Sequence, residues 1–445
     1  MCSFLFTNKE IKDIGYSNFF QKFRGPDNTN VVEDVENGFT FVHNLLSITG
    51  DRINQPFFKN NIVCMFNGEI YNHLDFGDYK TDGECLIDLY LEYGESFTKK
   101  LDGEFAIVLF DYEKSKFIVS TDVFSTKPIW LSFQGNKLGV ASYRSALERL
   151  NFYGEIKKIE ANTTEIYSFK DFNLTNKFTI KNFDLNQHKD SYSDWISAFE
   201  NSIKKRTANT REKIYIGLSS GYDSGAIAKE LSNQNVSFKA FSILGKENED
   251  IIKDRCNLLK NTEIIRMSDS QYNETKLFLN QNCEDYNYKN YRVLDDKACQ
   301  GLGYISKLAQ NENYKIYLSG QGADEIISDY GWGGFKIYPH SQFGGLFPKN
   351  LTQVFPWKSF FSGTQIDYIN KEECVAGCYG METRYPFLDV ELVQEFLWLT
   401  SELKNKSYKS CIKEYLSFSN FPFDKNSKCG FNPLVNSYQP IKLRG

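Results

Sequence analysis

The stretch LSSGYDSGA, residues 218–226, decides the fold expected for the second half of the chain. It follows KIYIGL (213–218), an apolar run with the length of a buried strand. Small residues then predict a tight turn, and a helix is expected to begin near Asp223. Because small residues let the backbone approach an anion and a helix start points free N–H groups at it, the stretch favours a phosphate-binding loop. An ordinary strand–helix connection with a serine cap is the alternative, since no GxxxxGK[ST] spacing is present.

The same alternation of strand and helix continues along this half of the chain. FKAFSIL (238–244) is a further predicted strand, and KIYLSG (315–320) repeats the pattern of a strand that ends in glycine. Strands separated by helices imply a parallel sheet, whose ligand site lies at the carboxyl ends of the strands. The second half is therefore expected to be an α/β domain with a parallel sheet.

The first half has a different rhythm of short strands and turns. Apolar runs of strand length are NIVCMF (61–66), FAIVLFD (105–111), KFIVSTD (116–122) and PIWLSF (128–133). Between them, TDGECLIDLYLEYG (81–94) spaces apolar residues along one helical face and ends in a glycine. This pattern predicts an α+β domain built on antiparallel sheet. The polar stretch 170–190 is expected to be a linker, which gives predicted domains at 1–180 and 190–445.

Composition narrows the function classes. The net charge of −5 and the absence of long basic runs argue against a nucleic-acid partner. The ten cysteines are scattered without repeated CxxC pairs, so neither a zinc ribbon nor a disulfide framework is indicated. No signal peptide and no apolar run of membrane-spanning length is evident, which predicts a cytoplasmic protein with free thiols.

Three motifs of the second half resemble the asparagine synthetase family. Residues 218–226 resemble the SGGxDS pyrophosphate loop of the ATP pyrophosphatases, with Ser220 in place of the first glycine. LSGQGADE (318–325) resembles the family's LSGEGSDE loop, and GMETRYPFLD (380–389) is close to GxExRxPFLD. The resemblance implies an ATP-pyrophosphatase domain that activates a carboxylate as its adenylate.

The resemblance also implies roles for particular residues. Asp223 and Asp324 would hold Mg²⁺ between the phosphates of ATP, because carboxylates suit that ion. In YKSCIKEYL (408–416), Lys409 would stabilise negative charge on the phosphate and the tetrahedral intermediate, with Lys413 as the alternative. The residues expected to contact ATP or pyrophosphate are Ser219, Ser220, Gly221, Asp223, Ser224, Ser242, Gly320 and Gly322.

Motifs of the first half resemble the class II glutamine amidotransferases, which implies an Ntn-hydrolase-like αββα sandwich. The matching segments are FRGPDNT (23–29), FNGEIYNH (66–73), TDGE (81–84) and LDGEFAIVLFD (101–111). Once Met1 is removed, Cys2 would be the nucleophile, and its own α-amino group would be the general base. The Asn67 side chain and the Gly68 backbone would form the oxyanion hole, and Asp82 would hold the ammonium of glutamine.

One departure concerns the binding of glutamine. The family's HxRLSI segment carries an arginine expected to bind the glutamine carboxylate, but here HNLLSI (43–48) has Leu45 at that position. Arg52 is the predicted substitute. The alternatives are a weak glutaminase or the use of free ammonia.

Another departure concerns the acceptor. Gln321 stands where the asparagine synthetases have a glutamate suited to proton transfer, and glutamine cannot act as a base. Glu382, in the third motif, is the carboxylate predicted to lie nearby. Asp295 and Asp296 would repel an aspartate substrate, unless they are solvated or lie elsewhere.

Together the motifs predict a glutamine-hydrolysing, ATP- and Mg²⁺-dependent amidotransferase. Its partners would be glutamine, ATP and a carboxylate acceptor, without nucleic acid or membrane, and homodimerisation is left open. The alternatives are amidation of another acid, such as a sugar acid or a biosynthetic intermediate, and a catalytically inactive family member.

Overall fold

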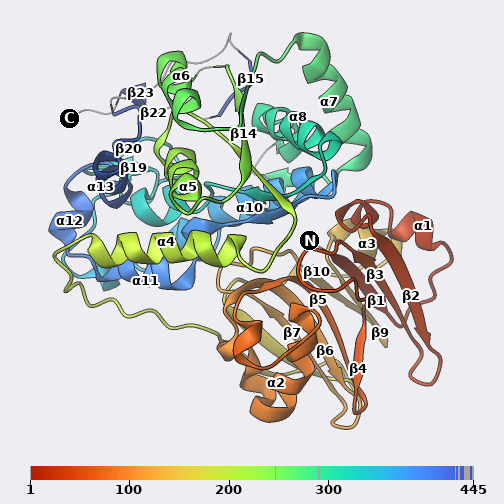
Figure 1. Cartoon of the computed structure of the whole chain (residues 1–445). Coiled ribbons are helices and arrows are strands. Elements are labelled where there is room, and N and C mark those ends of the chain that lie inside the picture. The colour runs from red at the N-terminus through yellow and green to blue at the C-terminus, as the bar shows by residue number, and fades with distance from the viewer. Residues whose placement is uncertain are drawn as a thin grey trace.

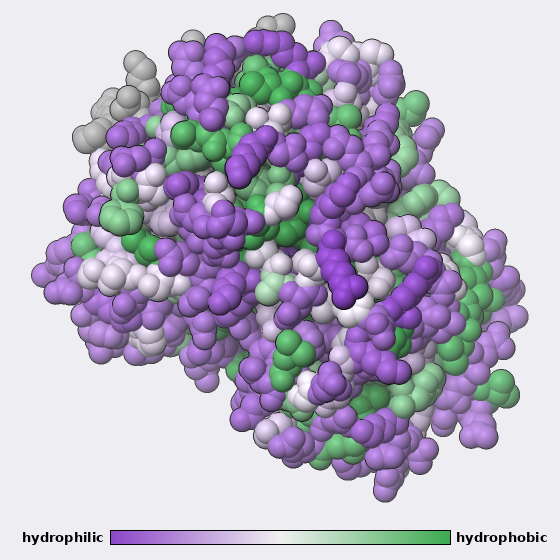
Figure 2. All heavy atoms as spheres, in the orientation of Figure 1, coloured by the Kyte–Doolittle hydropathy of each residue, from purple (hydrophilic) through white to green (hydrophobic). Residues whose placement is uncertain are grey.

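The computed structural model describes residues 2–245, 247–288, 291–425, 427–428, 431–434 and 441–442. Figure 1 shows two lobes, with the first part of the chain in the lobe drawn in red and orange and the second part in the lobe drawn in green and blue. Figure 2 shows that the same face is covered mainly by hydrophilic residues with small hydrophobic patches between them. Within the described residues, no helix has both the length and the apolar character needed to cross a bilayer.

The first lobe contains two antiparallel sheets. In spatial order, one consists of β10 (Ile156–Lys158), β8 (Trp130–Gln134), β9 (Lys137–Ala141), β1 (Ser3–Thr7), β3 (Phe39–Leu45) and β2 (Asn28–Asp34). The other consists of β12 (Leu174–Thr179), β11 (Thr163–Ser168), β7 (Lys116–Thr121), β6 (Gly103–Asp111), β5 (Ile62–Ile70) and β4 (Phe57–Lys59). The helical segments are α1 (Ile14–Ser17), η1 (Gln21–Arg24), η2 (His73–Asp75), η3 (Asp82–Glu84), α2 (Cys85–Tyr93), η4 (Gly94–Lys100) and α3 (Arg144–Arg149).

The alternation of side chains along the strands creates the layers of this lobe. Phe4 and Phe6 of β1 point into the core between the sheets, where Phe6 meets Phe110 of β6 with ring centroids 4.0 Å apart. Leu5, between them, faces outward and packs beneath α3, while α2 covers the outer face of the other sheet. The predicted αββα sandwich is confirmed.

The predicted linker at 170–190 is wrong in its first part, because β12 pairs there with β11 at the edge of the sheet. Most side chains of β12 are exposed, so its sequence shows no alternation of polar and apolar residues. An extended segment then leads to α4, which begins at Ser193.

The second lobe contains the parallel sheet that the strand–helix alternation predicts. Its spatial order is β15 (Thr262–Ile265), β14 (Phe238–Ile243), β13 (Lys213–Gly217), β18 (Tyr314–Leu318) and β21 (Glu382–Arg384). The order reverses direction between β13 and β18, and ligands of such sheets bind outside the carboxyl ends of the strands at this point.

The helices of this lobe are α4 (Ser193–Thr207), α5 (Tyr222–Asn233), α6 (Glu249–Leu258), α7 (Asp269–Asn282), α8 (Lys297–Asn311), α9 (Lys358–Phe361), α10 (Thr364–Gly377), α11 (Val390–Trp398), α12 (Ser401–Asn405) and α13 (Ser410–Phe418). Among them, α5 and α8 contact β13, α8 also contacts β18, and α10 contacts β21. Shorter helical segments are η5 (Val293–Asp295), η6 (Ala323–Ser328), η7 (Leu351–Gln353) and η8 (Pro386–Leu388). Two-residue strands form three antiparallel pairs, namely β16 (Asn287–Tyr288) with β17 (Tyr291–Arg292), β19 (Gly331–Trp332) with β20 (Phe335–Lys336), and β22 (Ser427–Lys428) with β23 (Ile441–Lys442).

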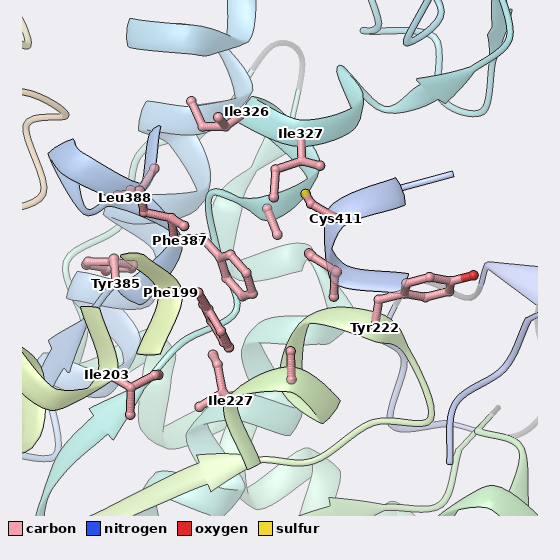
Figure 3. Packing of buried hydrophobic residues seen from close by; sticks show 14 of the residues in the cluster. Phe199, Ile203, Tyr222, Ile227, Ile326, Ile327, Tyr385, Phe387, Leu388 and Cys411 are labelled. Carbon is pink, nitrogen blue, oxygen red and sulfur yellow. The ribbon is translucent and has the colours of Figure 1, made fainter. Parts of the chain in front are cut away.

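One apolar cluster packs together the helices next to the predicted site residues of this lobe. Figure 3 shows Phe199 of α4, Ile227 of α5, Ile327 of η6 and Cys411 of α13 within the same packed core. Phe199 stacks on Phe387 of η8 with ring centroids 5.3 Å apart. Because these side chains are buried and closely packed, the polar segments attached to them keep a fixed relative position.

Buried ion pairs connect the two lobes. The carboxylate of Glu373 in α10 accepts hydrogen bonds from Arg24 at 2.7 Å and from Lys127 at 3.0 Å, and both of these cationic residues belong to the first lobe. Arg206 of α4 lies 2.8 Å from Glu104 of β6. Removing one partner of such a pair leaves an uncompensated buried charge, so the interface strongly favours one arrangement of the lobes.

Candidate functional site

A cavity of about 370 Å³ opens at the carboxyl ends of β13, β14 and β18. The loop after β13 and the start of α5 form one wall, and the loop after β18 forms another. Phe241, Ile243, Leu302 and Ile305 give it an apolar side between β14 and α8. The cavity therefore lies where the strand order predicts a ligand site.

Lys409 is buried behind the charged end of this cavity, where it pairs with two carboxylates that line it. Its ammonium nitrogen is 2.7 Å from both carboxylate oxygens of Asp223 and 2.8 Å from Oδ1 of Asp324. Tyr408 also donates to Asp324 Oδ1, at 2.8 Å. The structure thus brings together three residues that are separate in the sequence, and it selects Lys409 rather than Lys413 for this position.

The two carboxylates suit a divalent cation. Both reach one point, now held by the ammonium of Lys409, and carboxylate oxygens are the donors that Mg²⁺ prefers. Within the described residues, no group of three or more His, Cys, Asp or Glu side chains is placed to hold a metal ion. The donor set therefore fits an ion that takes its remaining ligands from phosphates and water.

Ser219, Asp223 and Ser224 of the predicted phosphate loop line the cavity. Ser219 and Ser224 hydrogen-bond through their hydroxyls at 2.8 Å, and Gly221 is the N-cap of α5. The backbone N–H and the hydroxyl of Ser220 both donate to one carboxylate oxygen of Glu247, each at 2.6 Å. An anionic oxygen is thus held by this loop in the structure, as a phosphate oxygen would be.

Arg255 of α6 supports the loop from behind. Its guanidinium donates hydrogen bonds to the backbone carbonyls of Ser219 and Gly221, the second at 2.8 Å. Burial lowers the pKa of Arg255 to about 9. Arg255 is absent from the residues predicted above because it lies far from the motif in the chain, and no local pattern marks it.

The loop after β18 approaches the phosphate loop closely. A Cβ added to Gly320 would lie 3.0 Å from the Cβ of Asp223, and Gly322 has a φ of +98°, which disfavours other residues. Gln321 lines the cavity, and its Nε2 donates to the carboxylate of Glu325. Burial, followed by the charge of Asp324, raises the pKa of Glu325 to about 7.

Two predicted residues lie away from this cavity. Ser242 is buried in β14 and points to the opposite face from Phe241 and Ile243, which line the cavity. Glu382 does not come near Gln321, because the first residue of β21 faces the interface between the lobes. There it accepts a 2.7 Å hydrogen bond from Arg384, which also lies 3.1 Å from Glu69 of the first lobe.

A smaller pocket of about 30 Å³ in the first lobe is lined by Cys2, Gly68 and Asp82. The thiol of Cys2 donates to the carbonyl of Leu46 at 3.8 Å, and burial raises its pKa to about 11. The carboxylate of Asp82 accepts a 2.8 Å hydrogen bond from the backbone N–H of Ile70, and burial raises the pKa of Asp82 to about 6. The neighbouring Asn67 amide is buried, and neither of its polar atoms is hydrogen-bonded within the described structure.

This pocket contains no substitute for the missing arginine. Leu45 lines it, whereas Arg52 is exposed outside it and donates to the backbone carbonyl of Asp27. Among the described lining residues there is no lysine, arginine or histidine, and three are acidic, namely Asp51, Glu69 and Asp82. The structure therefore does not bring Arg52 to the place that the prediction assigned to it.

Comparisons with known proteins match both lobes. The glutamine amidotransferase domain model matches residues 3–184, and the asparagine synthase model matches residues 194–359. Together these matches span most of the chain, which belongs to the family of proteins that join a glutamine amidotransferase domain to an asparagine synthase domain.

Individual relatives are distant. A putative glutamine-hydrolysing asparagine synthetase of Methanocaldococcus jannaschii is 28% identical over 454 residues, covering 87% of this chain and 78% of that protein. The glutamine-hydrolysing asparagine synthetase of Brassica oleracea is 26% identical, covering 86% of this chain and 66% of its own length. The solved glutamine phosphoribosylpyrophosphate amidotransferase from B. subtilis is 14% identical, with a match that covers 62% of this chain and 70% of that chain and a TM-score of 0.32.

Proposed function

We propose that this protein is an ATP-dependent ligase that converts a carboxylic acid to its amide through an acyl-adenylate, with nitrogen supplied from glutamine. The observation that carries the proposal is the position of Lys409 between Asp223 and Asp324, at the junction of the phosphate loop and the loop after β18. The family match of both lobes supports the pairing of an amidotransferase with a synthetase.

Adenylation is assigned to the cavity of the second lobe. An oxygen of the acceptor carboxylate attacks the α-phosphorus of ATP, and the bond from that phosphorus to pyrophosphate breaks. Ser219, Ser220 and Ser224 donate to the departing pyrophosphate, in the place that Glu247 now occupies on Ser220. Lys409 stabilises the negative charge that develops on the phosphate.

Mg²⁺ neutralises phosphate charge when it is bound. Asp223 and Asp324 would hold the ion, and the ion would then replace the ammonium of Lys409 as the partner of each carboxylate. The ammonium of Lys409 would become available to the substrate phosphate, at a place fixed by the packing of α13 around Cys411.

Amide formation completes the reaction. Ammonia attacks the acyl carbon, the carbon–oxygen bond to AMP breaks, and the nitrogen loses a proton. Gln321 cannot take that proton, so its role is to donate a hydrogen bond. That proton passes to the departing AMP phosphate or to solvent, and Glu372, which lines the cavity where Glu382 does not, is the carboxylate placed to contact the acceptor.

Glutamine hydrolysis is assigned to the pocket of the first lobe. Cys2 attacks the side-chain carbonyl of glutamine, and Asn67 and Gly68 stabilise the oxyanion. The unpaired amide of Asn67 supports this role, because a buried polar group without a partner is costly unless a ligand uses it. The ammonia released would reach the second lobe through the interface between the lobes.

Product analysis tests the proposal. The protein is incubated with Mg-ATP, a set of carboxylic acids that includes aspartate, and either glutamine or ammonium. We expect AMP and pyrophosphate in equal amounts, formed only when an acid is present. ADP and phosphate as products, or no acid-dependent turnover, would contradict adenylation.

A further inference from the structure

Aromatic side chains form the cavity wall beyond the two loops. Tyr330, Tyr338, His340 and Tyr368 all line it. The ring of His340 meets that of Tyr330 edge-on with centroids 4.1 Å apart, and it stacks on Tyr338 at 5.6 Å. Tyr330 follows the loop that carries Gln321 and Asp324, and its hydroxyl donates a hydrogen bond to Glu325 of that segment. The wall offers ring faces and edges to whatever carries the reacting carboxylate.

The charges around this wall do not suit a second carboxylate on the acceptor. Lys371 is the sole lysine or arginine among the described residues that line the cavity. Its ammonium lies 3.0 Å from Asp296 and 4.2 Å from the centroid of the Tyr368 ring. The positive charge of Lys371 is thus already compensated within the protein, and Asp296 is paired rather than solvated.

Glu372, next to Lys371 on α10, adds a negative charge to the same cavity. Its Oε2 is shielded from solvent and accepts no hydrogen bond within the described structure. Burial raises the pKa of Glu372 to about 7, against the opposing effects of Ser319 and Lys371. A carboxylate oxygen in such a place is stabilised most by a ligand that brings a positive charge and a hydrogen-bond donor.

We infer that the acceptor is a carboxylic acid that carries an amine, which pairs with Glu372, and an apolar or aromatic group, which packs on the wall formed by Tyr330, Tyr338, His340 and Tyr368. The inference rests on the proposed adenylating function and names the class of acid. Aspartate has the amine, but it places a second carboxylate against an aromatic wall, where the one lysine among the described lining residues is already paired with Asp296.

Three acids that differ in one group each test this inference. They are aspartate, 3-amino-3-phenylpropanoate, in which a phenyl ring replaces the α-carboxylate of aspartate, and 3-phenylpropanoate, which lacks the amine. Exchange of labelled pyrophosphate into ATP is measured for each acid with the full chain. We expect 3-amino-3-phenylpropanoate to show a kcat/KM about tenfold or more above that of 3-phenylpropanoate, the effect of one charged hydrogen bond. Its kcat/KM should also exceed that of aspartate, whose second carboxylate would meet the aromatic wall.

The variant Glu372→Gln distinguishes loss of the ion pair with the acceptor's amine from a general disturbance of the cavity. With 3-amino-3-phenylpropanoate as the acid, this variant is expected to have a kcat/KM about tenfold lower than the wild type, mainly through a higher KM. The rate with 3-phenylpropanoate should be unchanged. Asp295→Asn is the matched control, because Asp295 is half-exposed, lies 3.8 Å from Lys276 and does not line the cavity. This control should preserve the preference of the wild type.

Three outcomes would overturn the inference. Aspartate as the best of the three acids would contradict the inference and leave the proposed function standing. An equal loss for both phenyl acids in Glu372→Gln would show that Glu372 only maintains the cavity. Exchange with none of the acids would contradict both the inference and the adenylating function.

Discussion

Both carboxylate oxygens of Asp223 lie 2.7 Å from the ammonium nitrogen of Lys409. Lys409 adopts a left-handed backbone conformation with a φ of 45°, which costs free energy in a residue other than glycine. Its side chain is fully buried, so the surrounding core compensates for this conformation. Asp223 and Lys409 therefore form one electrostatic unit, which Mg-ATP must rearrange when it binds.

Asp223→Asn and Asp324→Asn are each expected to reduce formation of AMP and pyrophosphate by about 100-fold or more. Each change removes an anionic ligand from the point where the phosphates are neutralised, and electrostatic contributions of this kind are typically of that size. Glutamine hydrolysis without ATP should remain largely intact in both, because Cys2 lies in the other lobe. Pyrophosphate release at a normal rate in both variants would show that the assignment is wrong.

Cys2→Ala should abolish glutamine-dependent amide formation and leave ammonium-dependent formation intact. The pKa of the thiol is raised to about 11 by burial, so the thiol is protonated at neutral pH and needs a base. If that base is the α-amino group, glutamate release by the wild type should increase with pH through about 8 rather than about 11. Unchanged glutamine hydrolysis in Cys2→Ala would exclude this role.

Leu45→Arg is expected to lower the KM for glutamine by about tenfold, the effect of one charged hydrogen bond to the glutamine carboxylate. Arg52→Ala should change that KM by less than about twofold, because Arg52 lies outside the pocket and contacts the backbone of Asp27. Steady-state glutamate release measures both variants, and the melting temperature checks that Leu45→Arg folds. A large increase in KM for Arg52→Ala would mean that the arginine moves into the pocket when glutamine binds.

Gln321→Glu should destabilise the protein by about 1–3 kcal/mol at pH 8 and should not increase the amide formed per pyrophosphate. The new carboxylate would meet that of Glu325, whose pKa is already raised to about 7 by burial. A carboxyl with a raised folded-state pKa loses its contribution to stability as the pH rises, so the penalty should be smallest below about pH 4 and full above about pH 7.

Urea unfolding at several pH values measures this effect, with Gln321→Met as the control that removes the hydrogen bond without adding charge. The control should show a penalty that does not change with pH. A Gln321→Glu penalty equally independent of pH would contradict the assigned contact with Glu325.

The sequence predicted those parts of the site whose conformation depends on residues adjacent in the chain. Small residues before Asp223 and glycines on either side of Gln321 each predict a tight turn after a strand. Because the two strands are parallel neighbours, both turns lie at the same edge of the sheet, as the sequence predicted. Lys409 could be matched to the family helix, but its choice over Lys413 depends on packing around α13.

The misplaced residues depend on tertiary contacts. Glu382 begins a strand whose side chains are directed by pairing with β18, and that pairing turns it to the interface between the lobes. Ser242 faces the opposite side of β14 from its neighbours Phe241 and Ile243. Glu372 and Arg255 have no local signal, because only folding brings their helices to the cavity.

The most direct test of the proposed chemistry is acid-dependent exchange of labelled pyrophosphate into ATP by the wild type, Lys409→Met and Lys413→Met. We expect exchange by the wild type, a loss of about 100-fold or more in Lys409→Met, and little change in Lys413→Met, which lacks the contact with Asp223 and Asp324. Exchange by Lys409→Met at the rate of the wild type would contradict the assignment of adenylation to this site.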